Sequence, residues 1–322
     1  MNNTQNFTFI DLFAGIGGIR LAFEGVGGKC VFSSEWDKYA QQTYKLNFGD
    51  LPQGDITKIA SKDIPDHDIL TGGFPCQPFS SIGQRQGFKH KTQGTLFFDV
   101  ARIIKDKQPK AFLLENVKGL RTHANGSTYQ VIKDTLENEL GYIVFDKILN
   151  ASNYGVPQQR ERIYFVGFRK DVYCNSSLKF EWPKESGERI AFGQFVEENP
   201  ADKYSISKHL QESYLFKKDD GRPLLIDRDY DRPIKTLVAS YHKIQRLTGT
   251  FVKGGKTGVR LLTEKECKSI MGFPKEYKFD VSRTQMYRQM GNSVAIPVIK
   301  KIAKQMISVL EQERCECQKR PI

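Results

Sequence analysis

Short apolar runs alternate with stretches of helical spacing between residues 7 and 168. The runs at residues 9–13, 30–33, 111–114 and 163–168 have the length and composition of buried strands. Strands that alternate with helices predict a wound, mainly parallel sheet with helices on both faces. With 322 residues, the chain is long enough for one large α/β domain and a smaller second domain.

The character of the sequence changes near Trp182. From there to about residue 260 the apolar runs are short and turns are frequent, which predicts a smaller, partly β domain. Residues 201–260 contain 13 Lys and Arg against 7 Asp and Glu, and the whole chain has a formal net charge of +12. This excess favours a polyanionic partner, although a merely solvated surface can also be basic. Helical spacing returns at residues 263–271 and 294–310.

Other sequence signals exclude several classes of protein. The chain contains no run of eighteen apolar residues and no basic start followed by an apolar core, so we expect neither a membrane span nor a secretion signal. We therefore expect the protein to stay in the cytoplasm. The six cysteines show no CxxC pair, so we expect no metal site and no disulfide framework.

A glycine-rich segment at residues 13–18 follows the first predicted strand and opens a helix. Glycines let the backbone approach a ligand closely, and a helix N-terminus offers free N–H groups. Glu35 ends the next predicted strand, where a carboxylate can accept both ribose hydroxyls, and Trp36 offers a flat face to an adenine. Asp55, where a further strand should begin or end, is a candidate for the adenine amino group. The pattern also fits a plain tight turn, and it does not separate NAD from S-adenosylmethionine.

Cys76 lies between Pro75 and Pro78 in a segment that follows another predicted strand. Each proline fixes its own backbone φ, so the thiol is held in a defined loop at the edge where wound sheets bind ligands. A reactive thiol fits this placement, and a buried structural thiol is the more common alternative. Glu115 ends an apolar strand and should project from the same edge, either as a catalyst or as a strand-end ion pair.

Arg160 and Arg162 precede the predicted strand at residues 163–168. Alternation along an extended chain puts their side chains on one face. Taken alone, two such arginines are more ordinarily a surface salt-bridge pair. They gain significance from the other segments that accompany them.

Five segments resemble, in order, the motif set of the bacterial DNA cytosine-C5 methyltransferases. They are DLFAGIGG at 11–18, GFPCQPFS at 73–80, ENV at 115–117, QxRxR at 158–162 and GNSV at 291–294. The resemblance covers residues 7–170 and 260–310. Within 184–260 only Thr236–Leu237-x-Ala239 is similar to a motif of the family's recognition domain.

The resemblance implies two lobes with a DNA duplex in the cleft between them. The larger lobe, residues 1–183 and 285–322, is then a Rossmann-like α/β domain that binds S-adenosylmethionine and releases S-adenosylhomocysteine. The smaller lobe, residues 184–284, is a mostly β target-recognition domain with its hinge. The last helix returns to the larger lobe, which makes that domain discontinuous in sequence.

The resemblance also assigns residues to roles. It implies catalysis by Cys76, Glu115, Arg160 and Arg162. It implies a cofactor pocket built from Phe13, Ala14, Gly15, Gly17, Gly18, Glu35, Trp36, Asp55, Ile56, Phe74, Pro75, Leu96, Asn292, Ser293 and Val294. DNA contacts are expected from Ser80, Ser81, Gln84, Arg85, Lys89 and Thr236. Residues 80–94 are then a loop that closes on a base flipped out of the duplex, rather than a plain surface loop.

The implied activity is sequence-specific methylation of carbon 5 of cytosine in double-stranded DNA, through a covalent bond to Cys76. We expect a monomer without an obligate protein partner. A cognate restriction endonuclease would act on the same site without stable binding, and the methylation would protect host DNA from it. Three alternatives remain: an RNA cytosine-C5 methyltransferase, an NAD-dependent oxidoreductase with Cys76 as a redox thiol, and an inactive DNA-binding module. The recognised DNA sequence is not readable from the chain.

Overall fold

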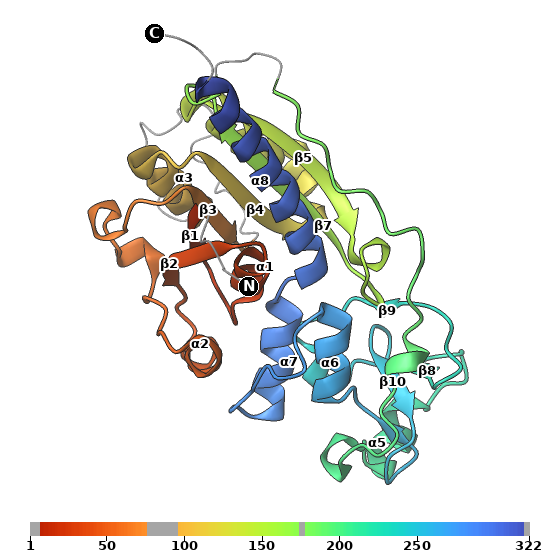
Figure 1. Ribbon diagram of the computed structural model, residues 1–322. Coiled ribbons are helices and arrows are strands. Elements are labelled where there is room, and N and C mark those ends of the chain that lie inside the picture. The colour runs from red at the N-terminus through yellow and green to blue at the C-terminus, as the bar shows by residue number, and fades with distance from the viewer. Residues whose placement is uncertain (1–6, 76–95, 174–177, 319–322) are drawn as a thin grey trace.

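A six-stranded sheet forms the centre of the larger part of the protein (Figure 1). The computed structural model describes residues 7–75, 96–173 and 178–318, with side chains up to residue 312. The strand order is β2-β1-β3-β4-β7-β5. The strands are β1 Phe7–Leu12, β2 Gly28–Ser34, β3 Ile69–Gly73, β4 Ala111–Val117, β5 Tyr142–Asn150 and β7 Glu161–Arg169. The pairs from β2 to β4 are parallel, whereas β7 is antiparallel to both neighbours.

Helices cover both faces of this sheet, as the sequence predicted (Figure 1). Along β1 the side chains alternate, so that Phe9 packs into one apolar cluster and Ile10 into the other. The first cluster is covered by α1 (Gly18–Glu24) and α8 (Ile296–Gln318), and the second by α3 (Leu96–Lys107). The remaining helices of the larger part, α2 (Lys38–Phe48) and α4 (Ser127–Asp134), follow β2 and β4.

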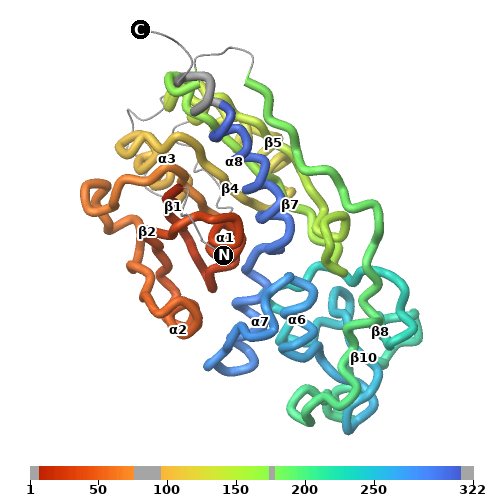
Figure 2. Tube along the Cα trace, viewed as in Figure 1, coloured from red at the N-terminus to blue at the C-terminus, as the bar shows by residue number. Residues whose placement is uncertain are grey.

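The final helix, α8, packs against α1 although the two are far apart in sequence (Figure 1, Figure 2). Ile299, Ile302 and Met306 on α8 are fully buried in the same cluster as Phe23 on α1. The end of the chain therefore completes the apolar layer on the sheet that its beginning forms. Within the part of the chain that the structure describes, no helix is long and apolar enough to cross a membrane.

The smaller part contains short strands and helices, shown in green, cyan and blue in Figure 2. Strands β8 (Leu224–Ile226), β10 (Thr250–Lys253) and β11 (Val259–Arg260) form one sheet. Strand β9 (Ile234–Lys235) pairs in parallel with β6 (Gln158–Gln159), which directly precedes β7. Helices α5 (Lys208–Leu210) and α6 (Glu264–Met271) complete it, and α7 (Arg283–Asn292) contacts α6 and leads into α8.

Several local features depart from simple sequence patterns. Gly72 and Gly73 belong to strand β3 and both pair with β4, although glycine is more typical of turns. Asp55 does not begin a strand, because it caps a short 3-10 helix, Ile56–Lys58. Close by in the sequence, Gln53 forms an isolated β-bridge with Ser34. The sequence did not predict strand β5 or helix α7. Many side chains of β5 are only partly buried, and α7 carries few apolar residues.

A buried ion pair joins β11 to α6. The Arg260 guanidinium contacts both carboxylate oxygens of Glu266 at 2.7 and 2.8 Å, and both side chains are at most 1% exposed. The same carboxylate accepts hydrogen bonds from the backbone N–H groups of Thr263 and Glu197, so each of its oxygens accepts two hydrogen bonds. Such a pair contributes stability only while both partners remain, because either charge alone is buried without compensation.

We expect Glu266→Gln to lower the free energy of unfolding by about 3–5 kcal/mol, because it leaves the Arg260 charge buried without its partner. Urea unfolding of the purified variant measures this. The matched control is Glu198→Gln, whose carboxylate pairs with Arg228 where both side chains are more than half exposed. Solvent screens that pair, so its loss should change stability much less. Equal losses in the two variants would contradict the argument.

Candidate active site and cofactor pocket

The carboxyl ends of β3 and β4 bring two of the predicted segments together. Gly73 lies opposite Glu115 in the parallel register of these strands. A Cβ atom at Gly73 would lie 3.4 Å from Glu115 Oε2, so the carboxyl group faces the end of β3. The chain runs from Gly73 through Phe74 and Pro75 to Cys76, which lies outside the described residues.

Glu115 forms an ion pair with Arg162 across β4 and β7. Arg162 Nε lies 3.1 Å from Glu115 Oε1, and the Glu115 residue is only 8% exposed. Burial raises the pKa of Glu115 above its ordinary value, although the positive charges of Arg162 and then Arg160 oppose the shift. The carboxyl group is therefore closer to protonation at neutral pH than a surface glutamate. A carboxyl group poised in this way can donate a proton or a hydrogen bond to a ligand.

Arg160 has a different environment, although the sequence predicted it beside Arg162. Its guanidinium donates hydrogen bonds to the carbonyl oxygens of Leu237, Gly291 and Ser293. Burial lowers its pKa to about 10, helped by the nearby Arg162, so the group keeps its charge at neutral pH. The two arginines thus contribute to one positive region, in which Arg162 pairs with Glu115 and Arg160 bonds to carbonyl oxygens.

Asn116 is a site residue to which the sequence reasoning gave no role. Its side-chain amide donates to the carbonyl oxygen of Phe74 at 2.9 Å and is buried. The Phe74 ring packs against Phe97 of α3, with ring centroids 5.6 Å apart. The backbone two residues before Cys76 is therefore anchored to β4. The signal was present, because Asn116 stands in the same short motif as Glu115.

The glycine-rich turn after β1 requires glycine at specific positions. Phe13, Gly15 and Gly17 all have positive φ. A glycine adopts such a conformation at little cost in free energy. Helix α1 begins at Gly18 with Gly17 as its N-cap, and no side chain caps its first N–H groups. A Cβ atom at Gly18 would lie 2.8 Å from Ser293 Oγ, which shows that the turn packs directly on the 292–294 segment.

Glu35 spans this turn and the start of the next segment. Its Oε2 accepts the N–H of Gly15 and its Oε1 accepts the N–H of Asp37, both at 2.8 Å. The residue is 9% exposed, and burial raises its pKa, while these backbone N–H groups oppose the shift. A carboxylate has lone pairs for about four hydrogen bonds, so two remain for the hydroxyls of a ribose. Trp36 beside it is 77% exposed and free to stack on a flat ligand.

The other predicted pocket residues differ in their burial and in their hydrogen bonds. Ile56 is buried and its carbonyl oxygen accepts a bond from Arg102 of α3, the helix that starts at Leu96. The Asp55 carboxylate accepts both the N–H and the hydroxyl of Thr57, which lower its pKa. Ala14, Ser293 and Val294 are buried, whereas Asn292 and Pro75 are exposed. The predicted DNA contacts Ser80, Ser81, Gln84, Arg85 and Lys89 lie outside the described residues.

Thr236 borders an open cleft of about 530 Å³ next to Arg162. Residues from both parts of the protein line it: Val117, Lys118, Gly119, Asn150, Gln159, Glu161 and Arg162 from the larger part, and Lys235, Thr236, Val238, Leu247 and Thr248 from the smaller. The Thr236 hydroxyl donates to the carbonyl oxygen of Gln159. The cleft therefore opens between Arg162 and its neighbours on one side and the segment 235–248 on the other.

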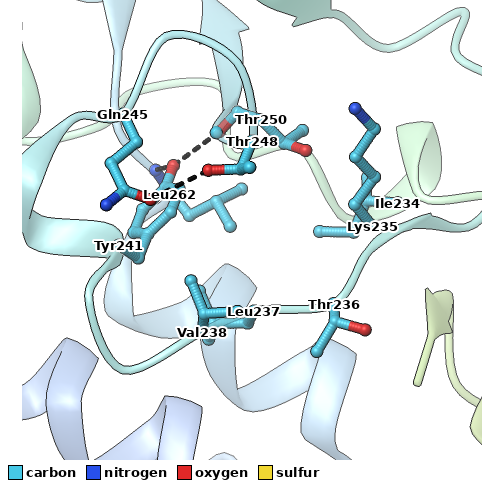
Figure 3. Close-up of a pocket in the computed structure, with 11 residues that line it drawn as sticks. Ile234, Lys235, Thr236, Leu237, Val238, Tyr241, Gln245, Thr248, Thr250 and Leu262 are labelled. Atoms are coloured by element: carbon cyan, nitrogen blue, oxygen red, sulfur yellow. Dashed lines mark hydrogen bonds between the residues drawn. The ribbon is translucent and has the colours of Figure 1, made fainter. Parts of the chain in front are cut away.

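Internal hydrogen bonds hold that segment as a loop (Figure 3). The hydroxyl of buried Tyr241 donates to the Thr250 carbonyl oxygen at 2.7 Å and accepts the Leu262 N–H at 3.0 Å. Thr248 donates to the Gln245 side chain at 2.9 Å. Figure 3 shows the Thr236 hydroxyl pointing away from Tyr241, on the opposite side of the chain. The loop is thus braced on one side and presents Thr236 on the other.

Comparisons with known proteins agree with this geometry. A family model described as C-5 cytosine-specific DNA methylase matches residues 7–308. The type II methyltransferase M.BsuFI of Bacillus subtilis is 60% identical over 95% of this chain and 73% of its own length. M.MspI of Moraxella sp is 56% identical over 96% and 72%. A crystal structure of a Spodoptera frugiperda DNMT2 mutant shares the fold, with a TM-score of 0.76 at 24% identity over 93% of this chain and 99% of that one. The chain therefore belongs to the C-5 cytosine-specific DNA methylases, the DNA (cytosine-5-)-methyltransferase enzymes that include the type II methyltransferases of restriction-modification systems.

Proposed function

We propose that this enzyme methylates carbon 5 of a specific cytosine in double-stranded DNA through a covalent bond to Cys76. The observation that carries the proposal is the buried Glu115–Arg162 pair: Glu115 lies beside the end of β3, and Arg162 lines the cleft between the two parts. The target carbon lies within a stacked duplex, so the base must be flipped out at a cost of a few kcal/mol.

The proposed chemistry begins with the Cys76 thiolate. Carbon 5 of cytosine is a poor nucleophile, and addition of sulfur to carbon 6 forms an S–C bond that moves an electron pair onto the ring. Glu115 in its protonated form donates to N3, and the Arg162 guanidinium holds O2, which stabilises the developing negative charge. Carbon 5 would use that electron pair to bond to the methyl group, and the donor would leave as a neutral thioether. Removal of the carbon 5 proton by a base then supplies the electron pair that re-forms the ring double bond and expels the Cys76 thiolate, which breaks the S–C bond. Positive charge from Arg160 and Arg162 favours the thiolate over the thiol.

We also propose the pocket for S-adenosylmethionine, which supplies an electrophilic methyl group when it is bound. Glu35 would hold the ribose hydroxyls with its two remaining lone-pair positions, and exposed Trp36 would stack on the adenine. The N-terminus of α1 and the buried Ser293–Val294 segment border the same turn. A buried carboxylate beside an exposed indole suits a nucleoside, which presents both hydroxyls and a flat base.

Glu35→Ala should raise the dissociation constant for S-adenosylmethionine roughly 10- to 100-fold, because it removes at least one hydrogen bond to a charged acceptor worth about 1.5–3 kcal/mol. Calorimetry measures the affinity, and bisulfite sequencing should show the same methylated sites. The matched control is Glu24→Ala, whose carboxylate pairs with Arg20 on α1. Unchanged affinity in Glu35→Ala would refute the assignment.

Cys76→Ser should abolish methyl transfer and leave cofactor binding nearly intact. DNA that carries 5-fluorocytosine should trap the wild type as a stable adduct, because no base can remove fluorine as a proton. Glu115→Gln keeps the thiol, so it should still form the adduct, but roughly 10²- to 10⁴-fold more slowly. Peptide mapping of the adduct identifies the cysteine. Attachment through any cysteine other than Cys76 would overturn the proposal.

The division into lobes is also a proposal. We infer that residues 1–183 and 285–322 carry the chemistry and that residues 184–284 read the DNA sequence. Packing of α8 on α1 supports the discontinuous larger lobe, and the basic stretch 201–260 supports DNA contact by the smaller one. Lys and Arg there would contact phosphates, while a few polar side chains such as Thr236 approach DNA from the cleft.

Replacing residues 184–260 with the matching segment of a relative that methylates a different site should transfer that relative's site to the hybrid. Bisulfite sequencing of plasmid DNA from a methylation-free host reads the outcome. The reciprocal hybrid, which keeps 184–260 and exchanges the rest, should retain the original site. An active hybrid that still methylates the original sequence would show that specificity resides elsewhere.

The remaining parts of the proposal concern the setting. The relatives are named type II methyltransferases, which supports a role in protecting host DNA from a cognate endonuclease. We propose a monomer that works in the cytoplasm on nucleoid DNA. The NAD-dependent alternative is excluded by the family match. An RNA substrate is distinguished by comparing methyl transfer to duplex DNA and to tRNA.

A further inference from the structure

Arg160 lies where three segments of the protein meet. Its guanidinium bonds to the carbonyl oxygens of Leu237 at 3.2 Å and Gly291 at 3.1 Å, and to that of Ser293. The residue is 3% exposed, so water does not replace these bonds. A planar guanidinium can bond to several carbonyl oxygens at once, whereas a lysine presents a single nitrogen.

One of the three contacts fixes the DNA-facing loop. Leu237 stands between Thr236 and Val238, which both line the cleft. Its N–H donates to the Gln158 side chain at 2.7 Å, while its carbonyl oxygen accepts from Arg160. Both backbone groups of Leu237 are thus held by the strand that leads to Arg162. The position of the loop is set by the 158–160 segment rather than by the loop itself.

The other two contacts fix the segment that borders the cofactor pocket. Ser293 and Val294 pack directly against Gly18 at the start of α1. A Cβ atom at Gly291 would lie 2.2 Å from the Ala239 nitrogen, so the same segment also presses on the DNA-facing loop. Helix α7, which ends at Asn292, is tied to α2 by the hydrogen bond from Thr43 to Gln289 at 2.9 Å.

We propose that Arg160 is a positioning residue that couples cofactor binding to DNA binding, and not a catalytic residue. This inference rests on the proposed function. A cofactor that settles against the glycine turn restricts the 291–294 segment, and Arg160 passes that restriction to Leu237. DNA bound at Thr236 and Val238 restricts the same unit from the other side. Two ligands that stabilise one packed unit bind with positive, reciprocal coupling.

The test measures the dissociation constant of S-adenosylhomocysteine with and without a saturating concentration of a DNA duplex that contains the site which the enzyme methylates. For the wild type we expect DNA to tighten binding tenfold or more. Arg160→Lys should reduce this ratio at least fivefold and change the affinity measured without DNA less than twofold. The matched control is Arg162→Lys, which should keep the ratio and lower kcat, because Arg162 contacts Glu115.

Amide hydrogen exchange provides a second measurement that needs no substitution. Binding of S-adenosylhomocysteine to the wild type without DNA should slow exchange in the segment 237–241. Unchanged exchange there, a wild-type ratio of one, or an unaltered ratio in a folded Arg160→Lys each overturns the inference. Failure of the wild type to bind S-adenosylhomocysteine instead contradicts the proposed function, so the two failures are distinguishable.

Discussion

Burial of Glu115 at the end of a central strand is the constraint on which the site depends. Residues 111–114 of β4 are fully buried, because helices cover both faces of the sheet there. The buried strand fixes the position of Glu115, and its register with β3 and β7 determines which residues lie next to Glu115. A carboxyl group in this position is desolvated, and the positive charges of Arg162 and then Arg160 offset part of the cost of its ionisation.

Arg160 and Arg162, which are separated by one residue, have different partners. Arg162 contacts the carboxylate and borders the cleft, so it suits contact with a substrate. Arg160 is bonded to backbone carbonyl oxygens and contributes its positive charge to the same region. Alternation along an extended chain explains why both point toward the same region. It does not explain their different partners: Arg162 pairs with Glu115 on the neighbouring strand β4, whereas the partners of Arg160 lie more than seventy residues away in the chain.

Glycines mark the places where distant segments must touch. Gly18 admits Ser293, and Gly291 admits the backbone at Ala239, at distances that a Cβ atom would not allow. These contacts bring the first glycine motif, the last motif and the segment 235–248 into one packed unit. The sequence motifs are therefore not separate sites joined by a scaffold, since each one forms part of the packing of the next.

The sequence by itself determined the wound α/β class, the order of the motifs and the residue types for the proposed chemistry, because apolar periodicity and local turn geometry are properties of neighbouring residues. It also predicted that Glu115 ends a strand. Only the tertiary structure decided that β7 runs antiparallel, that Arg160 bonds to carbonyl oxygens and that Asn116 anchors Phe74. These features depend on partners far along the chain, and a hydrogen bond or ion pair is set by position in space, which spacing along the sequence does not specify.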